Sequence, residues 1–429
     1  MNNRTRLRIG AVLVGLVAVL TVGVLWQRSA RSVSLDVPDR ADANPWVAAA
    51  GSFVAVAWGA RGSGKTDVFL AVSRDGGSTF GSPVQVNAIA GEARLGGELP
   101  PRVALVSQGD DSIPEIVVLW TAQSATTEVK VARSGDGGRS FAAPVTLQSR
   151  GAGGDRGWPA VALDHQANIH AIWLDHRGLA KDGATGANHS GHKGEHDGVA
   201  MAQKSGLYYA SMANGVSPER ELTNSVCYCC KTALAAGADG SLYAAWRHVY
   251  PGNMRDMAFT MSRDGGLSFS PPVRISEDGW AVNGCPDDGP AIAVDGRGDV
   301  HLAWPTVIDG VKPEGAIFYT STRDGRSFTP RVRIPTLGGP KPSHPQIVTD
   351  RAGRIFVAWD ESVKGRRVSA LRELRLQPGR APVFGDVVML SPKGDAVYPV
   401  LAATDAGLVA VWTTGGDPTR IEVRTLQMP

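Results

Sequence analysis

One phrase recurs seven times along the chain: an apolar strand, usually opened by proline, then a turn, then a second strand that ends in tryptophan. The closing tryptophans are spaced 62, 53, 73, 58, 55 and 53 residues apart. They are Trp58, Trp120, Trp173, Trp246, Trp304, Trp359 and Trp412. A period of this length, made of short strands and turns, is typical of four-stranded propeller blades. The repeat therefore predicts an all-β propeller over residues 32–429.

Four repeats continue with a second phrase rich in aspartate and glycine: SRDGGSTF (73–80), SGDGGRSF (134–141), SRDGGLSF (262–269) and TRDGRSF (322–328). An aspartate in such a turn can accept backbone N–H groups, and the glycines allow positive φ. The final aromatic residue can bury itself against the blade. These phrases resemble the Asp box, or BNR repeat, of the sialidase superfamily, and we expect them to connect the third and fourth strands of their blades.

The number of blades follows from the end of the chain. The resemblance to sialidases implies six blades, which is the alternative, but seven strand pairs are present. After Trp412 only one further strand, TRIEVRTLQ, remains, and SVSLDV at residues 32–37 can supply the missing fourth strand. The sequence therefore predicts seven blades, with the first strand closing the last blade.

The N-terminal segment, residues 1–31, is predicted to be a signal or anchor. Ile9 to Trp26 is a run of 18 residues without a charge, preceded by Arg4, Arg6 and Arg8. No small-residue cleavage pattern follows it, which favours an uncleaved membrane helix with the propeller outside the cytoplasm. Cleavage of this segment would give a secreted protein instead.

The charge of the remaining chain argues against nucleic acid as a partner. Five of the 44 basic residues flank the N-terminal apolar run, and no acid precedes Asp36. The other 39 basic residues face 41 acidic residues, a net charge of −2. A near-neutral body without a basic stripe lacks the electrostatic footprint of a nucleic-acid-binding protein.

Candidate binding and catalytic residues gather in the loops of one predicted face, which holds the connections between strands 2 and 3 and between successive blades. Loops on one face of a rigid scaffold commonly carry function. The resemblance to sialidases implies three arginines that hold a substrate carboxylate, a tyrosine nucleophile paired with glutamate, and an aspartate acid/base. The candidates on this face are Arg102, Arg177, Arg247, Tyr250, Asp287 and Glu361. No motif assigns their roles, because the sialidase F/Y-R-I-P motif is missing before the first box and the chain's only R-I-P follows the fourth.

Cysteines and histidines on the same predicted face form a second set of candidates. Cys227, Cys229, Cys230 and Cys285 all precede first strands of adjacent blades. They could form a disulfide that includes Cys285, or a soft-metal site for copper or zinc. An insertion after Trp173 places His189, His192 and His196 at metal-compatible spacing, although a solvated, flexible Gly/His loop is the slightly favoured interpretation.

Two functions from different classes remain after these observations. The first is a glycan-binding or exo-α-sialidase-like hydrolase, with a glycan or small molecule bound at the loop face. The second is a non-catalytic propeller that binds metal or a protein partner through its Cys/His-rich face. The missing arginine motif and the seventh blade favour the second function, and the Asp boxes favour neither.

Overall fold

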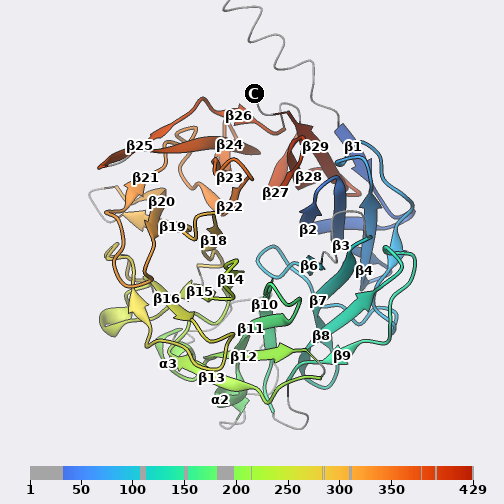
Figure 1. The fold of residues 1–429 in the computed structure, drawn as a ribbon, viewed down its shortest axis with the longest axis horizontal. Coiled ribbons are helices and arrows are strands. Elements are labelled where there is room, and N and C mark those ends of the chain that lie inside the picture. Colours follow the sequence, from blue (N-terminus) through green and yellow to red (C-terminus); the bar gives the residue numbers. More distant parts are fainter. Residues whose placement is uncertain are drawn as a thin grey trace, which may run out of the picture.

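The computed structural model describes residues 32–106, 113–148, 153–180, 198–213, 215–282, 284, 286–308, 312–377, 379–391 and 394–427. Seven antiparallel sheets surround a central axis (Figure 1). The first strand of each sheet contacts the first strands of both neighbouring sheets, so these seven strands form the inner ring. The predicted seven-bladed, all-β propeller is thus confirmed, and six blades are excluded.

Each of the first four blades runs outward from the axis in chain order. Their strands are, for blade 1, β2 (Ala41–Ala50), β3 (Phe53–Gly62), β4 (Lys65–Ser73) and β5 (Val84–Gln85); for blade 2, β6 (Arg102–Val106), β7 (Glu115–Gln123), β8 (Thr127–Ser134) and β9 (Val145–Thr146); for blade 3, β10 (Arg156–Leu163), β11 (Ile169–Asp175), β12 (Gly206–Met212) and β13 (Arg220–Asn224); and for blade 4, β14 (Ala233–Ala236), β15 (Leu242–Arg247), β16 (Met257–Ser262) and β17 (Val273–Arg274).

The last three blades follow the same plan with one elaboration. Their strands are, for blade 5, β18 (Ala291–Val294), β19 (Val300–Ile308), β20 (Glu314–Thr322) and β21 (Val332–Arg333); for blade 6, β22 (Ser343–Thr349), β23 (Ile355–Val363), β24 (Arg366–Gln377), β25 (Arg380–Phe384) and β26 (Val388–Met389); and for blade 7, β27 (Ala396–Thr404), β28 (Gly407–Thr414), β29 (Ile421–Leu426) and β1 (Ser32–Leu35). In blade 6 both β25 and β26 pair with β24. Short helices α2 (Arg177–Ala180), α3 (Gly198–Gln203) and η1 (Pro251–Asn253) lie in the connections.

The N-terminal strand closes the ring, as the sequence predicts. β1 pairs antiparallel with β29 from Ser32↔Arg424 to Leu35↔Ile421. Leu35 is buried in the cluster that also contains Val423 and Trp58. The first and last described strands of the chain therefore share one blade.

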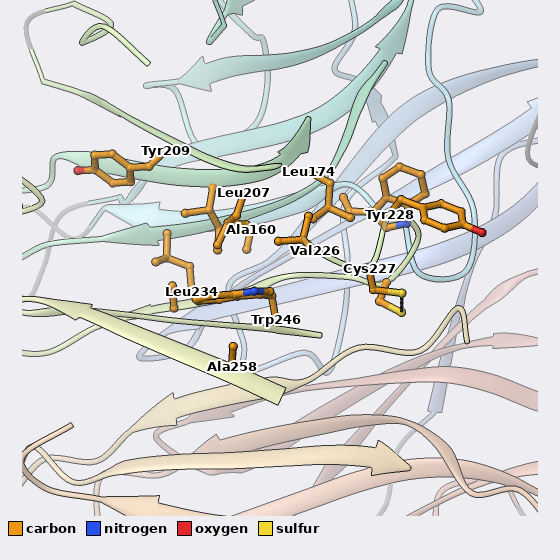
Figure 2. Close-up of a cluster of buried hydrophobic side chains, with 14 of the residues drawn as sticks. Ala160, Leu174, Leu207, Tyr209, Val226, Cys227, Tyr228, Leu234, Trp246 and Ala258 are labelled. Carbon is orange, nitrogen blue, oxygen red and sulfur yellow. Dashed lines mark hydrogen bonds between the residues drawn. The ribbon is translucent and has the colours of Figure 1, made fainter. Parts of the chain in front are cut away.

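Seven hydrophobic clusters hold the ring together, one between each pair of neighbouring blades. Between blades 3 and 4, Leu207, Ala160 and Trp246 point toward one another (Figure 2). The repeated tryptophans are buried, and several donate the indole N–H to a buried carboxylate: Trp58 to Asp42 at 2.7 Å, Trp173 to Asp175 at 3.3 Å, Trp304 to Asp278 at 2.9 Å and Trp359 to Glu361 at 2.7 Å. The repeat therefore supplies both apolar burial and a satisfied polar group at each of these positions.

The four Asp-rich phrases are the predicted turns between third and fourth strands. In the first, Asp75 accepts the backbone N–H groups of Ser78 and Thr79 at 3.0 and 2.9 Å and the hydroxyls of Ser73 and Thr79. These hydrogen bonds lower the pKa of Asp75 to about 2. Turn geometry thus accounts for the aspartate without a bound ion.

The predicted N-terminal membrane helix falls on residues 1–31, which lie outside the described residues. Within the described part of the chain, no helix is long and apolar enough to cross a membrane.

Candidate functional site

At one end of the axis, four inner strands begin with the same distortion. In blades 1, 3, 6 and 7 the pairing of the first two strands skips two residues, an X-Pro dipeptide. The X residues are Asn44, Trp158, His344 and Tyr398, and all four have φ between 53° and 58°. Positive φ is unfavourable for bulky residues, and such strain is found disproportionately at functional sites. The repeated proline thus marks a place where side chains are turned out of the sheet.

Side chains from several blades meet at this end of the axis. One cavity of about 10 Å³, enough for a single water, is lined by Trp46 of blade 1, Glu98 before blade 2, Lys231 before blade 4, His344 of blade 6 and Tyr398 of blade 7. Together with Asp288 of blade 5, we call Glu98, Lys231, His344 and Tyr398 the axial site. Its side chains fill the axis, so a ligand would contact them from the solvent side.

A buried ion pair forms the first half of the axial site. Lys231 Nζ donates to Glu98 Oε1 at 3.1 Å, and the backbone N–H groups of Lys231 and Gly289 donate to Glu98 Oε2 at 3.1 and 2.7 Å. A Cβ at Gly289 would lie 2.2 Å from the Lys231 carbonyl oxygen, so only glycine permits this approach. Glu98 is therefore fixed by three donors, which compensates for burying its charge.

His344 organises the second half of the axial site. Its Nδ1 is 2.8 Å from Asp360 Oδ2, and its backbone N–H donates to Asp288 Oδ1 at 3.0 Å. Burial opposes the charged imidazolium, but the carboxylates of Asp360 and Asp288 raise the pKa of His344 above its usual value. The Tyr398 backbone N–H donates to the same Asp360 oxygen at 2.7 Å, and its ring lies 4.2 Å from the His344 ring. Asp360 therefore orients both aromatic side chains.

Asp287 is the exposed carboxyl beside this network. Its backbone has a φ of 50°. Partial desolvation by the surrounding protein atoms raises the pKa of Asp287 from 3.8 to about 6, and the negative charges of Glu98 and Asp288 add to this shift. The charge of His344 lowers the pKa in part. A carboxyl group that titrates near neutral pH can both donate and accept a proton, as general acid/base chemistry requires. Asp287 was a candidate from the sequence, and the structure places it with the axial site.

The axial site is a poor match for a metal ion. Oxygen and nitrogen ligand atoms of Glu98, Asp288 and His344 lie within 4.8 Å of one another. The Lys231 ammonium is already bonded to Glu98, however, and His344 is held next to two carboxylates that favour its protonated form. The positive charges of Lys231 and His344 therefore already neutralise the carboxylates that a metal ion would bind.

The three predicted arginines are not brought together as a carboxylate clamp. Arg102 is buried, stacks 3.7 Å from the Trp46 ring centre and donates to the Pro159 carbonyl. Arg247 is buried and bonded to three backbone carbonyls, those of Arg255, Asp288 and Pro305. Burial lowers the pKa of Arg102 to about 9, so it remains charged at neutral pH. Its Nη2 lacks a hydrogen-bond partner among the described residues.

The third arginine belongs to an ion-pair network in blade 3. Arg177 pairs with Asp175 and with Glu219, both at 2.7 Å, and stacks over Tyr208. Its guanidinium is therefore satisfied by protein groups. The expectation that Arg102, Arg177 and Arg247 jointly face a ligand is not met by this arrangement.

Two further predicted residues have structural surroundings. Glu361 is completely buried and accepts the Trp359 indole N–H together with the backbone N–H groups of Leu337 and Gly339. Tyr250 stacks against His248 and lies under the Arg274 guanidinium, and burial raises its pKa to about 12. In the described part of the chain, neither side chain hydrogen-bonds to or stacks on a residue of the axial site, so the geometry does not support their catalytic assignment from loop position.

The cysteines form a buried cluster next to Lys231. Cys227 and Cys230 are free thiols, and Cys230 donates to Cys227 Sγ at 3.5 Å. Cys229 Sγ lies 3.9 Å from Cys227 Sγ. The Cys230 hydrogen bond and the guanidiniums of Arg255 and Arg247 lower the pKa of Cys227 to about 7 against the effect of burial. Three sulfurs thus converge, but Cys229 is disulfide-bonded, so only the thiols of Cys227 and Cys230 are free to bind a soft metal.

The remaining predicted metal ligands cannot be placed. Cys285 lies outside the described residues, so its pairing with another cysteine stays a prediction. His189, His192 and His196 also lie outside the described residues.

Loop position puts Glu98, Asp288, His344 and Tyr398 on the predicted working face, but sequence reasoning did not choose them as site residues, and it missed Lys231. A signal was present, because His344 and Tyr398 each directly precede the proline that opens an inner strand. Glu98 and Lys231 carry no comparable mark, and only the ring geometry brings them together.

Solved structures with the same fold include carbohydrate-active enzymes. An ulvan lyase of a new polysaccharide lyase family, bound to GlcA(1-4)Rha3S, shares 10% identity at a TM-score of 0.58, over 91% of this chain and 95% of that chain. A second polysaccharide lyase shares 12% identity at a TM-score of 0.52, over 92% and 91%. A protein of unknown function from Dyadobacter fermentans shares 14% identity at a TM-score of 0.51, over 93% and 99%. No family model and no curated protein matches the chain. At these identities the likeness concerns the fold.

Proposed function

We propose that this protein is a carbohydrate-active propeller that works on a glycan at the axial site. The observation that carries the proposal is Asp287, an exposed carboxyl with a pKa raised to about 6 beside the Glu98 and His344 network. Glycosidic bond cleavage needs a group that can donate a proton near neutral pH. The glycan-active enzymes that share the fold support the same substrate class.

The finer assignment, an Asp-box protein with exo-α-sialidase-like activity, rests on the four Asp-rich turns. A sialic acid carboxylate is best held by bidentate guanidinium groups. Arg102 and Arg247 are instead bonded to backbone carbonyls. We therefore propose a glycan substrate in general, of which sialosides are one class to be tested.

The experiment is a glycan panel tested on the purified propeller for binding and for release of new reducing ends, with sialosides, uronic-acid polymers and neutral arabinans included. We expect at least one class to be bound or cleaved, and Asp287→Asn to reduce cleavage at least 100-fold. Asp39→Asn is the matched control, because Asp39 is an exposed aspartate with a positive φ of 60° and no part in the site. No binding or turnover across the panel would reject the proposal.

We also propose that the protein acts outside the cytoplasm and is held at the membrane by Ile9–Trp26. The support is the uncharged run and its flanking arginines. Membrane fractionation of the full chain and of a chain lacking residues 1–31 tests this: only the full chain should sediment with the membrane.

The cysteine cluster favours a second candidate function, soft-metal binding. The Sγ atoms of Cys227, Cys229 and Cys230 lie within 4.8 Å of one another in one buried segment. Because Cys229 is held in a disulfide, we propose that the free thiols of Cys227 and Cys230 form a two-thiolate site suited to Cu(I). Metal analysis after Cu(I) loading should find one ion per chain, and none in Cys227→Ser. A thiol count of two before loading is also expected, and a metal-free wild type would reject this candidate.

A further inference from the structure

Blade 6 carries an elaboration that the other blades lack in the described part of the chain. Its third strand, β24, has 12 residues. The first half of β24 pairs with β26, which lies where the other blades have their fourth strand, and the second half forms a hairpin with β25. Figure 1 shows β25 at the outer rim, near β21 of blade 5. The hairpin thus extends toward the neighbouring blade instead of packing into its own.

A groove with a volume of about 1270 Å³ lies between this hairpin and blade 5. Its walls come from β20 and β21 on one side and from β24 and β25 on the other, with the turns at 295–299 and 351–354 at one end. A pocket for one small molecule usually has a volume of about 300 to 1000 Å³. This groove is large enough for several linked sugar units.

Arginines dominate the charged lining of the groove. Six arginines line it, with three acidic residues: Arg297, Arg323, Arg351, Arg354, Arg375 and Arg380, against Asp295, Asp299 and Glu373. The whole body beyond residue 35 is close to neutral, so this lining has a higher ratio of arginine to acid than the chain as a whole. Such an excess raises the local concentration of anionic ligands.

The acidic residues of the groove are already neutralised by their neighbours. Asp299 is bonded to Arg323 at 2.7 Å, and Glu373 to Arg375 at 2.6 Å. Asp295 is completely buried at its side chain and accepts two backbone N–H groups, and these together with Arg297 lower its pKa although burial alone would raise it. Two acids outside the lining, Asp350 and Asp405, pair with Arg354 and Arg351. The six arginines therefore face five carboxylates, and the groove keeps an excess of one positive charge.

Several guanidiniums remain accessible to a ligand. The side chains of Arg323 and Arg375 are 70% and 65% exposed. Arg380, on β25, is exposed and has no hydrogen-bond or ion-pair partner for its side chain among the described residues. Guanidinium groups bind sulfate and carboxylate oxygens in a bidentate manner. Leu376, 38% exposed, adds an apolar surface between them.

We propose that this groove binds an anionic polysaccharide, one that carries sulfate or uronate groups, as a second site separate from the axial site. The ligand class rests in part on the proposed carbohydrate function, whereas the existence of an anion-binding groove rests on the arginines alone.

The experiment measures binding of a heparin octasaccharide to the purified propeller by calorimetry, with a neutral dextran oligomer, polyphosphate and single-stranded DNA as comparison ligands. We expect Arg375→Gln with Arg380→Gln to weaken heparin binding at least tenfold, and added salt to weaken wild-type binding. Arg366→Gln is the control, because Arg366 is a half-exposed arginine at the opposite end of β24. Dextran should not bind.

The outcomes separate the two proposals. If Asp287→Asn loses activity at the axial site but keeps heparin binding, both sites stand, and if no glycan is processed while heparin still binds in the groove, only the axial proposal fails. Heparin binding that is equal in the Arg375/Arg380 variant and in the Arg366 variant overturns the groove. Groove-dependent binding of polyphosphate or DNA that matches heparin overturns the polysaccharide assignment.

Discussion

The indole–carboxylate pairs allow a direct test of what the repeated tryptophan contributes. Trp58 and Trp120 occupy the same position in blades 1 and 2, and both are completely buried. Trp58 donates to Asp42 at 2.7 Å, whereas the Trp120 indole N–H has no hydrogen-bond partner in the described residues. Replacing each with phenylalanine removes a similar apolar volume, but only Trp58→Phe leaves a buried carboxyl without its donor.

The expected difference follows from the cost of an unsatisfied group. Loss of part of the ring should lower the free energy of unfolding by about 1–3 kcal/mol in both variants. Trp58→Phe should lose a further ~1–3 kcal/mol, because Asp42 keeps only the Val37 N–H as a donor. Burial raises the pKa of Asp42 from 3.8 to about 6, so at pH 8 the unsatisfied group is a carboxylate and at pH 5 it is mostly a neutral acid.

The raised pKa of Asp42 also makes the free energy of unfolding depend on pH. Between pH 4 and 6 folded Asp42 holds a proton that the unfolded chain has lost, so its contribution to stability falls as the pH rises through 6. Trp58→Phe removes a hydrogen bond that lowers this pKa, so the fall in stability extends to higher pH and is larger in total. Urea unfolding at pH 5 and pH 8 measures both effects. Equal losses for Trp58→Phe and Trp120→Phe at both pH values would refute the reasoning.

Three further results are expected. Leu35→Ala should lower the free energy of unfolding by about 2–3 kcal/mol in urea and promote aggregation, since it loosens the closing strand, while the exposed Ser34→Ala should change it by less than about 0.5 kcal/mol; equal effects would contradict the closure. Glu361→Gln should cost about 2–3 kcal/mol in the same assay and leave glycan processing unchanged, because its three N–H donors meet an amide that cannot accept them all. Glycan cleavage by the wild type should fall as the pH rises through about 6, where Asp287 loses its proton, and a flat rate from pH 5 to 8 would exclude Asp287 as the acid.

The fold was predictable because its determinants are local and repeated. A buried tryptophan at the end of each second strand and an aspartate in four of the outer turns specify the same unit again and again. The closing strand was predictable as well, since a seventh blade with three strands needs a fourth partner.

The axial site was less predictable because it depends on which side chains point toward the axis of the ring. Loop position alone suggested Glu361, but Trp359 and Glu361 are two residues apart on one strand and therefore share a face. The spacing of tryptophan and acid was readable in the sequence and points to a structural role. The meeting of Glu98 with Lys231, 133 residues later, depends on the ring and has no local signal.

Closure by the first strand also constrains when the protein can become complete. Among the strands of the ring β1 is synthesised first and β29 last, yet they must pair across about 390 residues. Until then blade 7 is open, and its edge is available to other chains. A chain that stops before Ile421 would therefore fail as a whole ring and not merely lose its final strand, so a truncation just before β29 should be as damaging as one within an early blade.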